Sequence, residues 1–354
     1  MSTALFDHPY ISGLLGDAEM APHLNAESQL AAMLRFETEL AMAQAVEGVI
    51  PETAASAIVE AIDHLTLDFN ALRAGVERDG VVVPALVAEL RAATGGKHGR
   101  HVHFGATSQD LIDTAQALAL KEIVKILERR LADVLVVLDE LHKRDGKTKV
   151  MAHTRMQAAI PVTAARKIES WRDPLIRQNQ RLTQVRNDLL VLHYGGAAGT
   201  LDKLTGSKGP AVRARLAKRL GLRDIPRARH SERDGLANFA SWLSVLTGSL
   251  GKMGQDIALL AQSEVGEIVL ASGGGSSAMP HKVNPIGAEL LVTFARFNAT
   301  LLSAMHHALV HENERSGAAW TLERMVLPQM TVAAGAALRT AAGLIGSLSF
   351  RPTA

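Results

Sequence analysis

The sequence contains no cysteine, few aromatic residues and almost no excess of either charge. Without cysteine there are no disulfides, no thiolate metal sites and no cysteine nucleophile. Aromatic residues make up 4% of the chain, which leaves little material for stacking nucleic-acid bases. The 38 basic and 36 acidic residues leave a formal charge of +2. This charge is too small to indicate nucleic acid or an anionic membrane as a partner.

Targeting and membrane-spanning patterns are also missing. Residues 1–7 contain no basic stretch followed by an apolar run, so we expect no signal peptide. The most apolar long run, residues 330–350, contains Arg339, several glycines and many alanines. We interpret it as a helix buried between other helices, not as a membrane span. Together with the absence of cysteine, this favours the reducing cytoplasm as the location.

Apolar residues recur with a helical period along nearly the whole chain. Hydrophobic residues make up 47% of the 354 residues, and β-branched runs bounded by turns are scarce. The predicted fold class is therefore all-α. We expect a small N-terminal helical domain over residues 1–104, which ends just after a glycine-rich break. Residues 105–354 are expected to form an elongated bundle of long helices.

Five long helices are predicted in the bundle, and the first runs for almost forty residues without proline or glycine. Helices of this length need partners of similar length, and alanine-rich faces allow close packing. Such faces bury more area than one chain can cover, so we expect a homo-oligomer whose subunits share the bundle. The expected helices are residues 107–144, 154–192 (bent at Pro161 and Pro174), 231–271, 284–312 and 321–350.

A glycine-rich stretch, residues 273–285, carries the densest set of polar groups. Asn284 and the proline after it are typical of a helix N-cap and a first helical residue. Free N–H groups at that helix end, Lys282, Ser276 and Ser277 then converge on one small volume. This combination suits an anion and lowers the cost of deprotonating a serine. The alternative interpretation is a surface loop that ends in a helix cap.

A second polar stretch precedes the first long helix. Thr107 and Asp110 have the spacing of a capping box, which predicts a helix start. Thr107 and Ser108 also place two hydroxyl groups at the positive end of that helix, beside His103. We therefore consider this stretch a second candidate anion site.

Two weaker candidates lie further along the chain. His153 and Gln157, four residues apart, are expected to share a face at the start of the second long helix, next to Thr154 and Arg155. Arg315 follows the helix that the glycine-rich stretch begins, and its guanidinium could bind a carboxylate. Spacing alone leaves ordinary helix ends as the alternative at both places.

No metal or nucleotide cofactor is expected. Histidines cluster at residues 98–103 and 306–311, but neither group has a His-Glu-x-x-His arrangement or a carboxylate at a diagnostic spacing. No Walker or dinucleotide-binding glycine pattern lies between a strand and a helix.

Taken together, these stretches resemble the fumarase/aspartase superfamily. Its third signature, G-S-S-x-M-P-x-K-x-N, is matched along its full length by residues 275–284. Its first region in the adenylosuccinate-lyase-like branch, H-x-G-x-T-S-x-D, is matched by residues 103–110. Its second region usually has a Thr-His pair followed by a glutamine. Thr154 and Gln157 match this region, but Arg155 occupies the place of the histidine.

The missing histidine favours one branch of the superfamily. In most of these lyases the histidine is thought to protonate an amine or hydroxide leaving group. A carboxylate needs no such help, because its conjugate acid has a pKa of about 4. The chain is accordingly similar to bacterial 3-carboxy-cis,cis-muconate cycloisomerases, or lactonizing enzymes, which also lack the histidine. Members of that branch usually continue with a C-terminal helical domain, which we expect to be absent here.

The resemblance implies addition of a substrate carboxylate to a double bond of 3-carboxy-cis,cis-muconate, which forms a carboxymuconolactone in the protocatechuate branch of aromatic degradation. It also implies a tetramer with active sites shared between subunits. The implied catalytic residues are Ser276 as proton carrier and Lys282 and Asn284 as stabilisers of the intermediate. The implied substrate-binding residues are His103, Thr107, Ser108, Thr154, Arg155, Gln157, Ser277 and Arg315.

Two other functions stay open at this point. One is an amine-eliminating lyase that acts on adenylosuccinate or argininosuccinate, with His153 or another histidine in place of the missing acid. The other is a non-catalytic structural protein, as the lens crystallins of the superfamily are. The intact Ser276, Lys282 and Asn284 argue against the second alternative.

Overall fold

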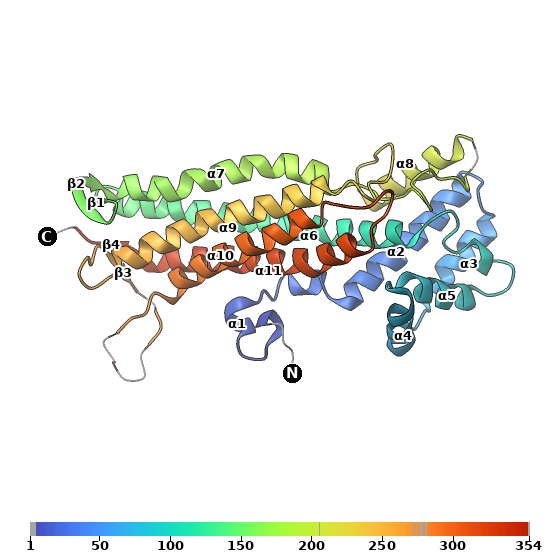
Figure 1. The fold of residues 1–354 in the computed structure, drawn as a ribbon, viewed down its shortest axis with the longest axis horizontal. Helices are drawn as coiled ribbons and strands as arrows, with labels where there is room; N and C mark the ends of the chain where they lie inside the picture. The colour runs from blue at the N-terminus through green and yellow to red at the C-terminus, as the bar shows by residue number, and fades with distance from the viewer. Residues whose placement is uncertain (1–4, 205, 272, 276–278, 280–281, 353–354) are drawn as a thin grey trace.

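The computed structural model describes residues 5–204, 206–271, 273–275, 279 and 282–352. Helices dominate an elongated molecule, as the all-α prediction requires, and five long helices run along its longest axis (Figure 1). The long helices are α6 (Ser108–Asp145), α7 (Ala164–Leu189), α9 (Asp234–Leu260), α10 (Ile286–His307) and α11 (Ala318–Ser347). The other α-helices are α1 (Ser12–Leu15), α2 (Ala26–Val46), α3 (Glu52–Asp63), α4 (Phe69–Asp79), α5 (Val83–Thr94) and α8 (Lys208–Leu220).

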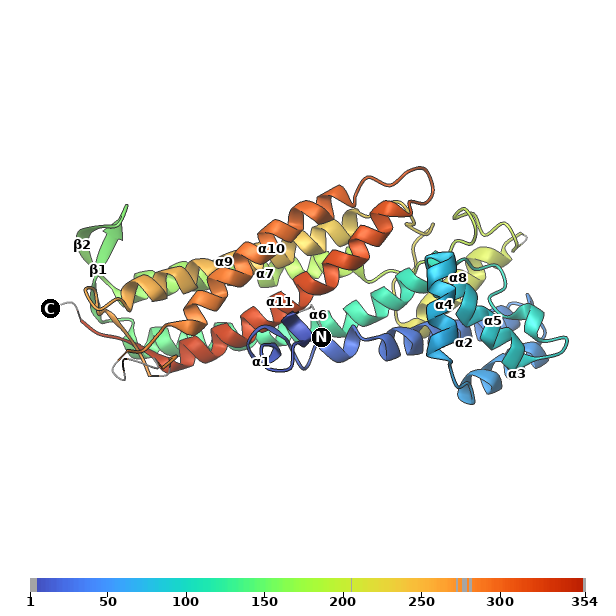
Figure 2. The same cartoon turned by 60° about the horizontal axis from the view of Figure 1, so that its bottom comes forward.

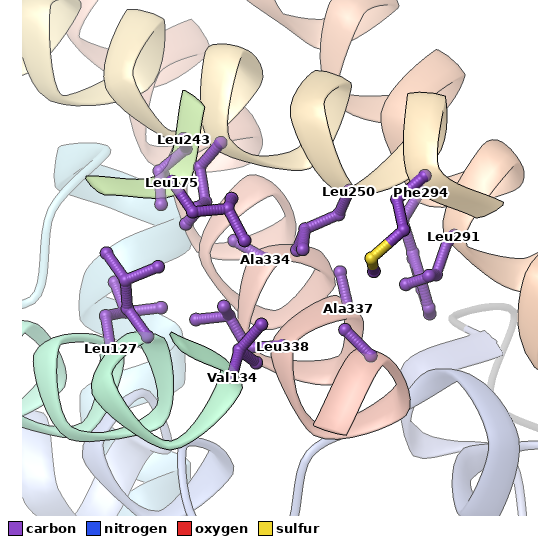
Figure 3. Close-up of a cluster of buried hydrophobic side chains, with 14 of the residues drawn as sticks. Leu127, Val134, Leu175, Leu243, Leu250, Leu291, Phe294, Ala334, Ala337 and Leu338 are labelled. Carbon is purple, nitrogen blue, oxygen red and sulfur yellow. The ribbon is translucent and has the colours of Figure 1, made fainter. Parts of the chain in front are cut away.

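Close packing of small residues brings the long helices together. A Cβ atom added at Gly254 of α9 would lie 2.6 Å from the backbone oxygen of Ala288 in α10, so only glycine permits this approach. Ala334 and Ala337 of α11 are fully buried in the same core. Figure 3 shows them among apolar side chains from α6, α7, α9 and α10. Four helices therefore contribute to the environment of α11, as expected for the buried run at residues 330–350.

A second group of buried apolar side chains lies where α2, α3, α5, α8 and the first turns of α6 meet (Figure 2). It also includes Leu192 and Tyr194 from the segment between α7 and α8. The start of α6 is therefore packed against this end of the molecule, and the rest of α6 belongs to the bundle core. The domain boundary after residue 104 stays a prediction.

Residues 149–163 form a β-hairpin, so the predicted helix over residues 154–192 was wrong for its first ten residues. Strands β1 (Lys149–Thr154) and β2 (Gln157–Thr163) pair antiparallel, with Val150 opposite Val162 and Met151 opposite Pro161. Proline disrupts a helix interior but is tolerated at the free edge that each strand of a two-stranded sheet has. Helix α7 begins only at Ala164 and contains Pro174, as predicted.

The other helix boundaries also differ from their predictions. Strand β3 (Ile268–Leu270) pairs antiparallel with β4 (Leu348–Phe350), so α9 and α11 end before the residues that the helical period had included. A positive φ of 61° at Gly266 turns the chain between α9 and β3. Within the described residues, no helix combines the length and the apolar character needed to cross a membrane.

Candidate active site

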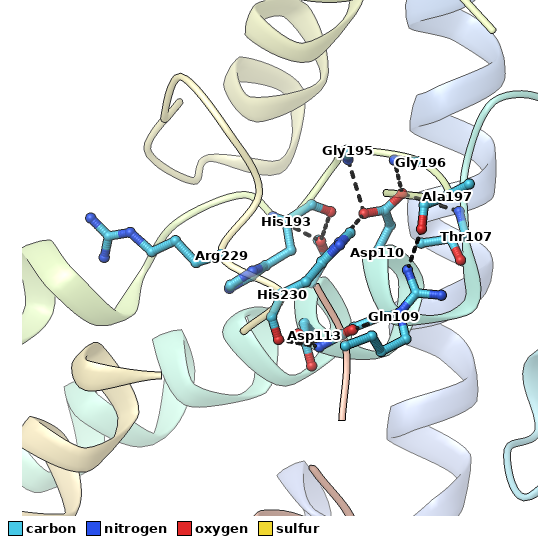
Figure 4. Close-up of polar contacts among 12 residues, drawn as sticks. Thr107, Gln109, Asp110, Asp113, His193, Gly195, Gly196, Ala197, Arg229 and His230 are labelled. Carbon is cyan, nitrogen blue, oxygen red and sulfur yellow. Dashed lines mark hydrogen bonds and ion pairs between the residues drawn. The ribbon is translucent and has the colours of Figure 1, made fainter. Parts of the chain in front are cut away.

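The start of α6 is built around the buried carboxylate of Asp110 (Figure 4). The backbone N–H of Thr107 donates to it at 3.1 Å, which confirms the capping box. The N–H groups of Gly195 and Gly196 donate to its two oxygens at 2.9 Å each. His230 Nε2 lies 2.7 Å from the same carboxylate. Asp110 therefore ties a glycine-rich segment after α7 to the helix end that carries the two predicted hydroxyl groups.

The segment after α7 needs glycine because its backbone lies very close to the backbone of Gly105. Gly196 has a φ of 71°, and a Cβ atom there would lie 2.9 Å from the oxygen of Gly105. Any other residue would strain the backbone at this φ and would place its Cβ atom too close to that oxygen. The segment therefore fixes the turn that carries His103, whose ring Nδ1 lies 2.5 Å from Glu37 Oε1 of α2.

Arg315 reaches the same helix end from the connection between α10 and α11. Its Nε donates to Gln109 Oε1 at 3.0 Å and its Nη2 donates to the backbone oxygen of Ala197 at 3.0 Å. The structure thus brings Arg315 next to the α6 end that carries Thr107 and Ser108. One exposed guanidinium and two hydroxyl groups at a helix N-terminus form an arrangement suited to carboxylates.

A buried ionic cluster lies directly beneath this surface. The Arg233 guanidinium donates to Asp113 at 2.7 Å and to Glu323 at 2.6 Å, and Trp320 Nε1 donates to Asp113 at 2.9 Å. Burial alone would raise the pKa of Asp113, but Arg233 outweighs it and holds that pKa below its ordinary value. Burial raises the pKa of Glu323 despite the same arginine. The cluster joins α6, the start of α9 and α11 at one point.

His193 lies beside this cluster as a neutral imidazole. It is buried, its backbone oxygen accepts from Thr114 Oγ1 at 2.9 Å, and its ring Nδ1 has no partner in the described part of the chain. Burial lowers its pKa to about 4, and the neighbouring Asp113 only partly counteracts this. Near neutral pH, His193 therefore carries no charge.

The second predicted region lies on the exposed hairpin instead of a helix. Thr154 and Gln157 pair across β1 and β2, and Arg155 and Met156 form the two-residue turn between them. Their φ values of 50° and 65° are those of a type I′ turn, which glycine and asparagine usually occupy. His153 and Gln157 share no helical face, so that prediction was wrong. Thr154, Arg155 and Gln157 are all exposed.

The third region folds back on itself before α10. Gly274 and Asn284 exchange two backbone hydrogen bonds, of 3.0 and 2.9 Å. The N-cap position belongs to Pro285, and α10 begins at Ile286, so the predicted Asn284 cap was one residue too early. The bonds to Gly274 occupy the backbone of Asn284, and its side chain makes no cap. Lys282 is exposed at this loop, whereas Ser276 and Ser277 lie outside the described residues.

The predicted site residues that the structure describes lie at opposite ends of the long bundle. His103, Thr107, Ser108 and Arg315 lie at the start of α6, whereas the hairpin follows the end of that helix (Figures 1 and 2). Helix α6 has 38 residues, which correspond to about 57 Å at 1.5 Å per residue. Lys282 and Asn284 precede α10, which starts at the hairpin end of the bundle. Within a single chain, Arg315 therefore lies next to the first region, whereas the second region and the described residues Lys282 and Asn284 lie at the other end.

Sequence reasoning missed the buried partners of this site. Asp113 lies three residues after Asp110, and this pair of carboxylates on one helix face was the available signal. Other residues gave no signal, because the contacts that join them across the site are distant in sequence: Gln109, His193, His230, Arg233, Trp320 and Glu323. Among the described residues, no three histidine, aspartate or glutamate side chains could share a metal ion. Two apolar surface grooves of about 560 and 870 Å³ contain none of the predicted site residues that the structure describes.

Comparisons with known proteins agree with this architecture. The model of a family described as lyases matches residues 18–297, and the chain belongs to this family. It is 39% identical over 337 residues to the 3-carboxy-cis,cis-muconate cycloisomerase of Pseudomonas aeruginosa, covering 94% of this chain and 73% of that protein. It is 38% identical over 345 residues to the enzyme of the same name from Bradyrhizobium diazoefficiens, covering 96% of this chain and 76% of that protein.

A solved structure shows the same fold. The crystal structure of the 3-carboxy-cis,cis-muconate lactonizing enzyme from Pseudomonas putida superposes with a TM-score of 0.90 at 34% identity. The match covers 97% of this chain and 78% of that one. These comparisons confirm the predicted relationship and the fold class.

Proposed function

We propose that this chain is an intramolecular lyase that cyclises 3-carboxy-cis,cis-muconate to a carboxymuconolactone in the protocatechuate branch of aromatic degradation. The observation that carries this proposal is the 39% identity to a cycloisomerase of that name over nearly the whole chain. The exposed Arg315 beside Thr107 and Ser108 supports it, because a tricarboxylate needs several separate anion-binding groups. We expect no cofactor for this reaction and place it in the cytoplasm.

The reaction consists of one bond formation and one proton transfer. An oxygen of a substrate carboxylate forms a C–O bond with one carbon of a conjugated double bond. The π electron pair of the double bond moves to the neighbouring carboxyl group and creates an aci-carboxylate with two negative charges. Ser276 then donates a proton to the α-carbon, which restores an ordinary carboxylate. Because a carboxylate is the nucleophile, the step needs no acid at the position of Arg155.

Each predicted residue has a role in this scheme. Lys282 and Asn284 stabilise the charge of the aci-carboxylate, which we expect to be the largest electrostatic contribution. The backbone N–H groups at the start of α10 lower the cost of the serine alkoxide that forms in the same step. The remaining carboxylates are bound by His103, Thr107, Ser108, Thr154, Arg155, Gln157, Ser277 and Arg315.

The reaction requires more than one copy of the chain. About 57 Å of helix separates the first region from the hairpin that carries the second region. Copies packed side by side in opposite directions would place the start of one α6 beside the end of another. We therefore propose a homotetramer in which three subunits contribute to each active site. The apolar grooves along α11 offer surface for such contacts.

The decisive experiment follows the ultraviolet absorbance of the conjugated diene when purified protein meets 3-carboxy-cis,cis-muconate. We expect rapid loss of absorbance with the wild-type protein and none with Ser276→Ala. Loss with both proteins would remove the serine from the mechanism. No loss with either protein, together with fumarate released from adenylosuccinate or argininosuccinate, would show an amine lyase instead.

A further inference from the structure

Arg315 is an exposed arginine whose orientation is set by its neighbours. Its Nε and Nη2 donate to Gln109 Oε1 and to the oxygen of Ala197, at 3.0 Å each. Both bonds use the Nε side of the planar guanidinium. Among the described residues, neither N–H of Nη1 nor the second N–H of Nη2 has a partner. One N–H of Nη1 and the second N–H of Nη2 lie parallel at the end of the guanidinium, which is the geometry in which arginine binds a carboxylate.

Gln109 can hold Arg315 in only one way. Its side chain is fully buried, and its Nε2 donates to the oxygen of His230 at 2.8 Å and to Asp113 Oδ2 at 3.1 Å. A reversed amide would place its oxygen against these two acceptors and its NH2 group against the N–H of Arg315. The neighbours of Gln109 therefore determine that its Oε1 faces Arg315.

The buried ionic cluster fixes Gln109 in turn. Asp113 accepts from Gln109, Trp320 and Arg233, and Arg233 also binds Glu323. These contacts come from α6, α9 and α11, so the amide rests on the point where three long helices meet. An exposed arginine normally loses side-chain freedom when it binds an anion. A rigid, buried acceptor removes that freedom before the ligand arrives, which makes binding tighter.

We infer that Gln109 is a positioning residue that orients the Arg315 guanidinium to bind one carboxylate of the substrate. This inference rests on the proposed function, because it assigns the anion to that active site. It goes beyond that function by naming a buried residue that touches no substrate.

A double-mutant cycle tests the inference by calorimetric titration with propane-1,2,3-tricarboxylate, a saturated anion that cannot cyclise. We expect Arg315→Ala to raise the dissociation constant roughly 30-fold and Gln109→Leu to raise it about tenfold. Because Gln109 acts through Arg315, the double variant should bind no more weakly than Arg315→Ala alone. Gln184→Leu, which changes an exposed glutamine of α7 that donates to Asp188, is the matched control and should bind like the wild-type protein.

Removing the buried amide of Gln109 could also disturb folding. Arg315→Lys therefore serves as a second test, because it changes only the exposed partner of the same contact. Lysine keeps the charge but offers a single ammonium instead of two parallel donors. We expect about tenfold weaker binding and an unchanged melting temperature. Wild-type affinity in Arg315→Lys, additive effects in the double variant, or no binding by the wild-type protein would each overturn the inference. A wild-type protein that binds the probe but leaves the diene intact would instead contradict the proposed reaction.

Discussion

The two ends of α6 hold their polar residues in opposite ways. At the start of the helix, Asp110 and Asp113 are buried and accept from partners on several other elements. Beyond its far end, Arg155 and Met156 are exposed in a turn whose positive φ values neither residue prefers. The first end is completed within one chain, whereas the second presents its side chains outward. The start of α6 thus forms a finished set of contacts within one chain, whereas the hairpin end is the one that, under the proposed function, meets another copy.

The largest expected effect comes from removing the charge at the centre of the finished end. Arg233→Leu leaves two buried carboxylates, Asp113 and Glu323, without their shared cation. We expect the free energy of unfolding to fall by about 3–5 kcal/mol, measured by denaturant titration at pH 7 and fixed protein concentration. Arg129→Leu, which breaks an exposed pair with Glu19, should change it by less than about 1 kcal/mol. Equal losses for the two variants would mean that burial of the cluster contributes nothing.

A second effect follows from the neutral His193. Its pKa of about 4 lies below the ordinary 6.5, so the unfolded chain binds the proton more readily than the folded one. The contribution of the neutral His193 to the free energy of unfolding is therefore fully present above pH 6.5. It is lost as the pH drops toward 4, and the loss is at most about 3 kcal/mol. His193→Gln should show a shallower loss of unfolding free energy over this window. Identical slopes for the two proteins would contradict the assignment.

The smallest effect on stability, and the sharpest on function, is expected at the hairpin. Asn and Gly are favoured in type I′ turns, so the double change Arg155→Asn and Met156→Gly should leave the unfolding free energy unchanged or raise it by up to about 1 kcal/mol. The same protein should lose lactonization because it lacks the Arg155 cation. Met156→Gly alone relieves part of the strain, keeps Arg155 and should retain activity. Full kcat/KM in the double variant would show that the charge of Arg155 is not used.

The difference between the two ends also explains what the sequence could predict. The start of α6 follows from a local pattern, because Thr107 and Asp110 cap the helix three residues apart. The resemblance to a superfamily placed Arg315 in the same site, but the chain itself carries no local sign of that contact. Gln109, Arg233 and Glu323 join one cluster only after three separate segments, the starts of α6 and α9 and helix α11, have packed together.

The hairpin was mistaken for a helix for a different reason. His153 and Gln157 fit a spacing of four, and the alanines around them do not exclude a helix. The segment forms strands because Val150 pairs with Val162. This pairing depends on a turn formed by Arg155 and Met156, which are unusual residues in a type I′ turn. Residues that occupy an unfavourable turn are poorly predicted by propensity, since propensity describes what turns usually contain.

The uninterrupted length of α6 also limits how this chain can change during evolution. One residue inserted into a continuous helix would shift everything beyond it by about 1.5 Å and rotate it by about 100°. In the proposed tetramer, the hairpin would then face away from the α6 start of the neighbouring copy. Insertions within α6 should therefore be rejected even where every inserted side chain is solvent-exposed, while the loops near both helix ends should accept them. If the proposed tetramer forms, the residue count of α6 sets the distance between the first region and the hairpin, and it matters as much as the residues at the two ends.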